Sequence, residues 1–230
     1  SKLSKRLTND HFDDIDARYA QLGGFEGILF ASNRKDLSLD RRRIDTILPI
    51  DHLDIFFLEL GEDENTLTQV TNTPFVSEQM AMSLDSTYYT YINDDNGIAN
   101  RYRGYLEEVV IGYETTLFLT NGEKVVGPRD SLISMAAKLE VDSSATIPLK
   151  LKISHNETIS NNGSSILLHH TLPKRNQIIE LKKIDDQYVY SLSKTDGLQN
   201  IVPINTSNKQ ENIQKLQLAN RSSQSKTLNI

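Results

Sequence analysis

The part of this sequence best suited to chemistry is a short run of aromatic and charged residues around the end of a predicted strand. Aromatic ring faces attract cations and carboxylates pair with them, so such groups at a sheet edge suit an amine or another small polar ligand. We therefore predict a ligand-binding site composed of Tyr88, Tyr91, Asp94, Asp95, Tyr102 and Arg103. The alternative is that alternate tyrosines pack in the core while the others cover the surface.

No signature of a known enzyme class occurs: there is no nucleophile elbow, zinc-protease helix motif, P-loop or dinucleotide-binding glycine motif. Three carboxylate pairs have the chemistry for acid–base catalysis, namely Asp13-Asp14, Asp94-Asp95 and Asp185-Asp186. Two of them fall in predicted turns and one opens a predicted helix, where aspartate is favoured for local backbone reasons. We expect no catalytic activity, and the enzyme alternative is a hydrolase with a paired-aspartate site.

The sequence also predicts neither a metal site nor a cofactor. It contains no cysteine, which excludes thiolate ligands and disulfides. His169 and His170 are neighbours in a predicted strand, so their side chains point to opposite faces and cannot share one metal ion. The remaining histidines, His11, His52 and His155, lie far apart and lack metal-ligand spacing.

Composition and charge narrow the classes of partner. A net charge of −6 and an isoelectric point near 5.4 argue against nucleic acid, which requires clustered lysine and arginine. The same negative charge favours a cationic ligand or a basic partner surface. No apolar run approaches the length that crosses a bilayer, and the N-terminal residues lack the apolar segment of a signal peptide.

The strongest local pattern is a hairpin at residues 115–126. Residues 115–120 are β-branched and aromatic, and Asn121-Gly122 suits the two positive-φ positions of a type I′ turn. A helix is predicted to lead into it over residues 98–111, because apolar residues recur there at three- and four-residue steps.

A second helix is predicted at the N-terminus, over residues 8–31. Thr8 or Asn9 caps it, aspartates occupy its first turn, and an apolar stripe follows with helical spacing at Phe12, Ile15, Tyr19 and Leu22. This helix either packs on a core or forms a stalk that pairs with a second copy. Residues 36–50 are predicted to form another helix, ended by Pro49.

The rest of the chain is predicted to consist mainly of strands. A hairpin covers residues 53–60 and 66–70, and a strand covers residues 87–92. Beyond the central hairpin we expect a helix at 131–139 and strands at 147–153, 165–172, 177–183 and 187–193. Residues 205–230 are polar and poor in aromatics, which is typical of a flexible tail.

These elements predict an α+β fold: an N-terminal helix followed by one or two antiparallel sheet modules of the PAS or Cache type. The corresponding domains are a stalk helix at 1–35, a smaller α+β module at 36–97, a fuller module at 98–204, and the tail at 205–230.

The order of these parts resembles the periplasmic double-PAS sensor region of the LuxQ-type quorum-sensing histidine kinases. It resembles more loosely the Cache-like sensor regions of membrane-bound kinases and diguanylate-signalling receptors. The resemblance depends on the entry helix around Asp10-His11-Phe12, the strand at 53–60 with its acidic loop, and the helix leading into residues 112–127. It covers most of residues 8–193.

The resemblance implies a sensor domain on the periplasmic side of the cell inner membrane, attached through flanking membrane segments. Its partner would be a small ligand or a periplasmic binding protein, its N-terminal helix would relay the signal, and a homodimer would form through that helix. The alternative from another class is an intracellular adaptor or scaffold subunit whose sheet faces bind a protein partner.

Overall fold

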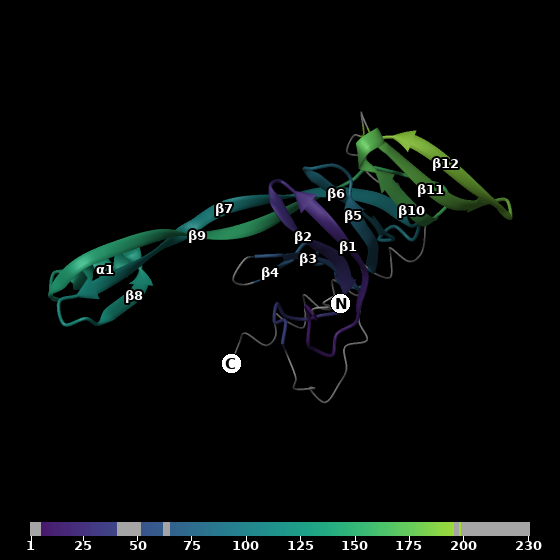
Figure 1. Ribbon diagram of the computed structural model, residues 1–230. Coiled ribbons are helices and arrows are strands. Elements are labelled where there is room, and N and C mark those ends of the chain that lie inside the picture. Colours follow the sequence, from purple (N-terminus) through teal and green to yellow (C-terminus); the bar gives the residue numbers. More distant parts are fainter. Residues whose placement is uncertain (1–5, 41–51, 62–64, 196–197, 199–230) are drawn as a thin grey trace, which may run out of the picture. The chain divides into compact units, whose positions relative to one another are not determined.

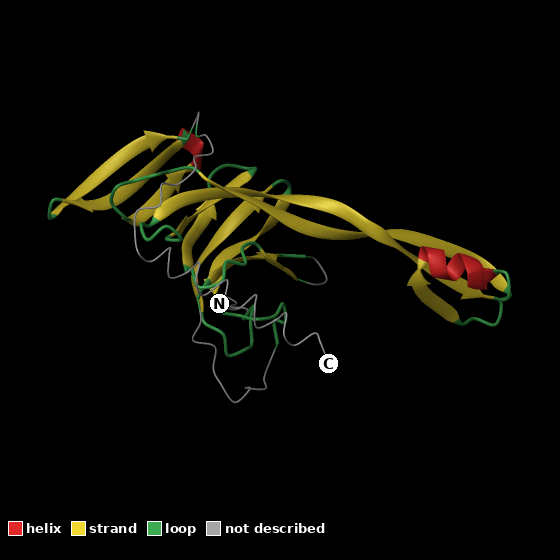
Figure 2. Ribbon diagram, turned by 180° about the vertical axis from the view of Figure 1, so that it is seen from behind, coloured by secondary structure: helices red, strands yellow, loops and turns green. Residues whose placement is uncertain are grey.

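The computed structural model describes residues 6–40, 52–61, 65–195 and 198, and these form an almost entirely antiparallel β protein (Figure 1). Strands contain 59% of the described residues and helices 6%. Figure 2 shows the few helical segments in red. The predicted α+β class with an N-terminal helix is therefore wrong.

The N-terminal segment is a hairpin of β1 (Asp14–Leu22) and β2 (Phe25–Ser32). Gly23 and Gly24 form its turn with φ values of +60° and +93°, which glycine adopts without steric cost. Ala20 and Leu22 are buried whereas Tyr19 is exposed, so the side chains alternate with the period of a strand. This hairpin excludes the predicted stalk helix, its relay of a signal and a homodimer through it.

The first sheet has the order β1-β2-β3-β4, with β3 at Asp54–Glu59 and β4 at Thr66–Gln69. The hairpin predicted over residues 53–70 is thus confirmed. Residues 36–40 are not helical. The remainder of the helix predicted over 36–50 lies outside the described residues.

The second sheet has the order β5-β6-β7-β8, and β9 pairs with β7. Its strands are β5 (Glu78–Ser83), β6 (Tyr88–Asn93), β7 (Asn100–Leu119), β8 (Lys124–Pro128) and β9 (Val141–Thr158). The helix predicted over residues 98–111 is therefore wrong, because these residues belong to β7. Tyr102 and Leu106 are buried and Tyr105 is not, and pairing of Tyr91 with Tyr102 aligns β7 with β6.

The central hairpin is confirmed, although its turn differs from the predicted one. Only Gly122 has a positive φ, +86°, and its N–H donates to the Leu119 carbonyl at 2.9 Å. The Leu119 N–H donates to the Glu123 carbonyl, so the connection is a type I turn followed by a glycine bulge. A helix, α1 (Arg129–Ala136), follows near its predicted place at 131–139, with Asp130 in its first turn.

The third sheet has the order β10-β11-β12. These strands are Ile166–Leu172, Gln177–Ile184 and Gln187–Lys194, and a short 3-10 helix, η1 (Pro173–Arg175), joins the first two. Asp185 and Asp186 both have positive φ, which makes the turn between β11 and β12 a type I′ turn. All three strands were predicted from sequence, but they form a sheet of their own.

The chain divides into two compact units, Ser1–Leu106 with Ser154–Ile230 (the first unit) and Glu107–Ile153 (the second unit). The long strands β7 and β9 contribute residues to both. The boundary predicted between residues 97 and 98 falls inside the first unit, and the predicted tail at 205–230 lies outside the described residues. No helix in the described part of the chain is long and apolar enough to span a bilayer.

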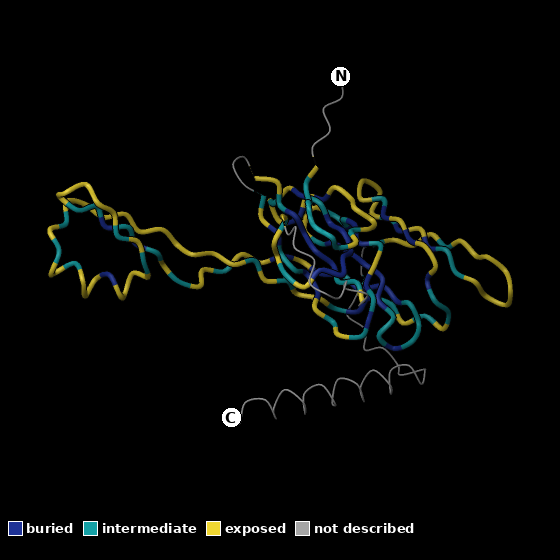
Figure 3. The backbone as a smooth tube through the Cα atoms, turned by 90° about the horizontal axis from the view of Figure 1, so that it is seen from below, coloured by how far each residue is buried: buried dark blue, intermediate teal, exposed yellow. Residues whose placement is uncertain are grey.

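The main core lies in the first unit, where the first two sheets contribute most of the buried residues coloured dark blue in Figure 3. Its largest side chains are those of Leu22, Leu29, Ile55, Phe57, Tyr89 and Tyr91. A smaller cluster joins Phe30, Phe56, Leu58 and Leu67 of β2, β3 and β4.

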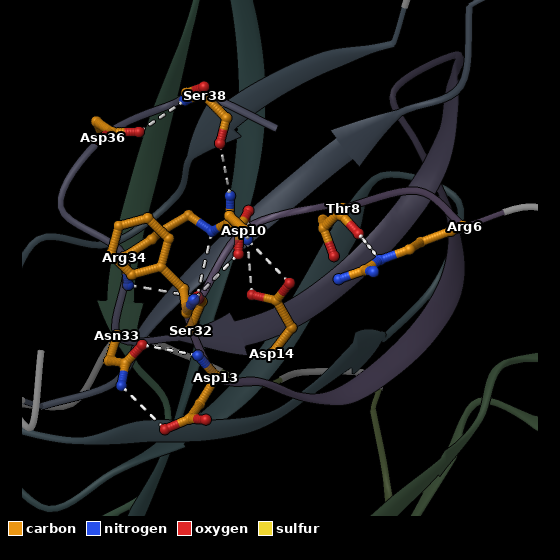
Figure 4. Close-up of polar contacts among 11 residues, drawn as sticks. Arg6, Thr8, Asp10, Asp13, Asp14, Ser32, Asn33, Arg34, Asp36 and Ser38 are labelled. Carbon is orange, nitrogen blue, oxygen red and sulfur yellow. Dashed lines mark hydrogen bonds and ion pairs between the residues drawn. The ribbon is translucent and has the colours of Figure 1, made fainter. Parts of the chain in front are cut away.

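Arg34 lies beside this smaller cluster and is 3% exposed. Figure 4 draws its polar contacts with Asp14, Ser32 and Ser38. Its guanidinium lies 5.3 to 5.6 Å from the ring centroids of Phe12, Phe30 and Phe56. It donates to both carboxylate oxygens of Asp14, at 2.7 and 2.9 Å, and lies 3.5 Å from Asp10. This arginine therefore ties residues 10–14 to the sheet through charge and ring contacts together.

Replacing Arg34 with methionine should strongly destabilise the protein, because Asp10 and Asp14 would lose their shared cation in a buried site. Loss of one partner of a buried ion pair costs about 3 to 5 kcal/mol. The free energy of unfolding, measured by urea denaturation, should fall by an amount of that order. Arg129→Met is the matched control, since its exposed guanidinium also lies over a ring, that of Tyr113. Equal losses for both variants would contradict the structural role of Arg34.

Candidate functional site

The six residues of the predicted ligand site occupy both faces of the β6–β7 pair. Tyr91 and Tyr102 are direct cross-strand partners that face the core, with their rings stacked at 5.5 Å between centroids. The Tyr102 hydroxyl donates to Asp95 at 2.7 Å, and Asp94 is in the same turn as Asp95. Burial raises the pKa values of both tyrosines well above their usual range.

Tyr88 and Arg103 lie on the opposite face of these strands. The Arg103 guanidinium is 5.0 Å from the centroid of the Tyr88 ring, and its Nε donates to Glu157 of β9. Tyr105 packs edge-on against Tyr88 and stacks on His155. The structure thus brings the six residues together as two groups rather than one, and a ligand-binding role for them stays a prediction.

Beneath the core-facing tyrosines lies a buried carboxyl group that sequence reasoning missed, that of Glu78. It accepts hydrogen bonds from the hydroxyls of Thr71 and Thr73 and from the side-chain amide of Asn93. Burial, reinforced by the nearby negative charge of Asp54, raises the pKa of Glu78 to about 7. Burial also raises the pKa of Asp54. No motif marks Glu78, because its partners come from separate elements.

A second buried polar cluster joins β7 of the second sheet to β10 and β11 of the third. Arg101 forms an ion pair with Glu180 at 2.6 Å and donates to His169 at 3.4 Å. The other ring nitrogen of His169 is 2.7 Å from the Met80 carbonyl oxygen. Burial and the charge of Arg101 lower the pKa of His169 to about 4, so the imidazole is neutral at pH 7.

The described residues contain no group of three or more histidine, aspartate or glutamate side chains arranged to hold a metal ion. His169 is engaged by Arg101 and Met80, and His170 contacts the Thr171 carbonyl instead. The two neighbouring histidines therefore have separate partners, as expected for adjacent residues of a strand.

The second unit exposes many large apolar side chains and buries few. Among its residues only Thr115, Leu117 and Leu132 are buried. Ten large apolar side chains are exposed by 39 to 62%: Val110, Ile111, Tyr113, Val126, Ile133, Met135, Ile147, Leu149, Leu151 and Ile153. Four of these alternate along β9 with Pro148, Lys150 and Lys152.

Sequence reasoning found this alternation and predicted a half-buried strand at 147–153. The strand is confirmed, but its apolar side chains are 39 to 57% exposed. Within the second unit β9 is held to β7 by the Lys150–Glu108 ion pair at 2.6 Å and by a hydrogen bond between Thr115 and Thr146 at 2.8 Å. We refer to the ten exposed side chains of the second unit as the apolar surface; they lie on both faces of its strands, since Val110 and Ile111 are adjacent in β7.

Comparison with protein-family models, curated proteins and solved structures finds no match to this chain. The resemblance to LuxQ-type and Cache sensor regions consequently stays a prediction.

The Glu78 network predicts a specific dependence of stability on pH. A raised carboxyl pKa means that the folded protein binds the proton more tightly than the unfolded chain, whose glutamate has a pKa of 4.5. The stability contributed by protonated Glu78 is therefore complete below pH 4.5 and is lost as the pH rises to about 7. Compared with wild type, Glu78→Gln should become progressively more stable across this interval.

The measurement is urea denaturation of both proteins at several pH values. Taking the difference between the two proteins cancels the opposite effect of His169, whose lowered pKa removes stability as the pH falls. A difference that does not change with pH would contradict the buried, proton-binding state of Glu78. The exposed Glu123→Gln variant supplies the baseline.

Proposed function

We propose that this chain is a non-catalytic scaffold protein whose copies associate through the apolar surface of the second unit. The observation that carries the proposal is the imbalance within residues 107–153, which bury three side chains and expose ten large apolar ones. The sequence analysis gave an adaptor or scaffold subunit as the alternative function. We now propose a second copy of the same chain as its protein partner.

The second unit has too small a core to be stable by itself. A two-stranded antiparallel ribbon is at best marginally stable in water, because ordering each residue costs conformational entropy that only buried apolar area offsets. Here Leu117 and Leu132 are the buried apolar residues, and Leu132 of α1 covers Gly127 of β8. Covering the apolar surface with a partner supplies the missing buried area.

The charges around the apolar surface favour a second copy as that partner. The second unit contains seven acidic and five basic residues, so its net charge is only −2 and two copies repel each other weakly. On β9, Lys150 and Lys152 alternate with the apolar residues, while β7 carries Glu107 and Glu108. Lys150 already pairs with Glu108 of the same chain at 2.6 Å, so a second copy meets a surface whose charges are largely balanced.

The backbone offers a further point of contact. β7 pairs with β6 up to Tyr105 and with β8 from Glu114 onward, so residues 108–113 have no strand on that side among the described residues. An unpaired edge presents N–H and C=O groups to any strand of matching length. Val110, Ile111 and Tyr113 lie along this edge strand and are 47 to 62% exposed.

The sensor function that the resemblance implies stays a prediction. The signal relay predicted for it required an N-terminal helix. Residues 14–22 and 25–32 form a hairpin, so the helix predicted over residues 8–31 does not form there. Binding of a periplasmic binding protein and a periplasmic location have no support in the geometry of the described residues beyond that expectation.

We expect wild-type protein to sediment as a dimer or larger assembly at high concentration and to dissociate on dilution. The double variant Leu149→Glu, Leu151→Glu should sediment as a monomer at every concentration, because burying two unpaired carboxylates in an apolar interface is strongly unfavourable. Both side chains are at least 39% exposed, so the variant should keep the circular dichroism spectrum of the wild type. Sedimentation velocity over a wide concentration range makes the measurement.

Leu192→Glu is the matched control, since Leu192 of β12 is 60% exposed and lies in the first unit. It should assemble as the wild type does. A wild type that remains monomeric at all concentrations would overturn the proposal. Loss of assembly in Leu192→Glu, with assembly retained in the double variant, would overturn the proposal and indicate an interface on the third sheet.

A further inference from the structure

The first unit contains a groove of about 710 Å³ that neither the predicted site nor the proposed function uses. Its walls come from β1, from the turn after β5, and from the end of β10 with η1. Residues that line it include Tyr19, Ser86, Thr171, Pro173, Lys174 and Arg175. The groove therefore lies where elements of all three sheets meet.

Hydrogen bonds between the sheets hold these walls in place. The Thr171 hydroxyl donates to the Ser83 carbonyl at 2.6 Å, and its backbone N–H lies 3.3 Å from the sulfur of Met82. The Gly23 N–H donates to the Ser86 carbonyl at 2.8 Å, which fixes the β1–β2 turn to the turn after β5. A groove with walls tied in this way is formed before any ligand arrives, which lowers the cost of binding.

Positive charge gathers around this groove in a protein that is acidic as a whole. Lys174 and Arg175 line it, and Arg18 lines an adjoining hollow that shares Tyr19, Thr171 and Pro173 with it. None of these three cations forms an ion pair with another described residue. Their charges are consequently available to an anion.

The one carboxylate in the lining is already engaged. Asp85 accepts hydrogen bonds from the backbone N–H groups of Thr87 and Tyr88, each at 2.7 Å. These bonds fix its orientation within its own turn and offset part of its charge. The remaining lining is largely apolar, with Ala20, Leu172, Pro173 and the ring of Tyr19.

We propose that this groove binds a small organic anion, with its carboxylate held by Lys174 and Arg175 and an apolar body lying against Tyr19, Leu172 and Pro173. Arg175 suits a carboxylate because its planar guanidinium can donate two parallel hydrogen bonds. The apolar lining adds the area that a purely ionic surface site lacks. The sequence had favoured a cationic ligand from net charge, whereas the local charge here is opposite in sign.

Octanoate is the probe for this proposal, with octylammonium and inorganic phosphate as the comparison ligands, titrated into the full chain by isothermal calorimetry. We expect octanoate to bind and octylammonium not to bind. The double variant Lys174→Gln, Arg175→Gln should weaken octanoate binding by at least about tenfold, since hydrogen bonds to charged groups contribute more than a tenfold factor in affinity.

The control Arg129→Gln, Lys138→Gln removes the same charge from exposed positions of the second unit and should leave affinity unchanged. Absence of octanoate binding, equal binding of octylammonium, or full affinity in the Lys174 and Arg175 variant would overturn the proposal. Phosphate that binds as tightly as octanoate would show that the apolar lining is not used, and would overturn the class of ligand. Assembly through the second unit is measured separately and is unaffected by any of these outcomes.

Discussion

The antiparallel pairing of β7 with three other strands is the constraint on which most of this structure depends. β7 pairs with β6 near its start, with β8 near its end, and with β9. Close approach requires a glycine at position 104, because the Tyr89 ring and the His155 backbone both lie where a side chain would begin. Since β7 contributes to both compact units, its register sets which residues reach the core and which remain uncovered.

Charged groups buried in the first unit are paired through elements that are distant in sequence. Arg34 after β2 pairs with Asp14 at the start of β1 and with Asp10 before it, and Arg101 joins Glu180 and His169 across the second and third sheets. A buried charge is tolerated only when a partner and hydrogen bonds replace its water. These contacts favour one arrangement of the sheets, because any other would leave ions buried without partners. Glu78 is also buried, but its raised pKa of about 7 keeps the carboxyl group protonated and uncharged below that pH.

The two proposed functions belong to different parts of the chain and have different physical origins. The groove depends on walls tied together by hydrogen bonds and on cations that have no described acidic partner. The apolar surface of the second unit has a different origin. Its strands carry more large apolar side chains than the unit buries. A ligand site benefits from rigid walls, whereas an assembly surface is stabilised when its partner arrives. The two proposals can therefore be tested, and can fail, independently.

Local turn chemistry made several hairpins predictable from the sequence. Asn121-Gly122 and Asp185-Asp186 mark turns between runs of β-branched and aromatic residues, and β3–β4, β7–β8 and β11–β12 form where expected. Residues 8–31 and 98–111 were predicted wrongly because apolar residues three and four positions apart fit a helix as well as parts of a strand. Only a paired neighbour decides between them: β2 pairs with β1, and β6 with β7. The Glu78 network, the Arg101 cluster and the groove were beyond sequence reasoning, because each joins residues that only the packing of separate strands brings together.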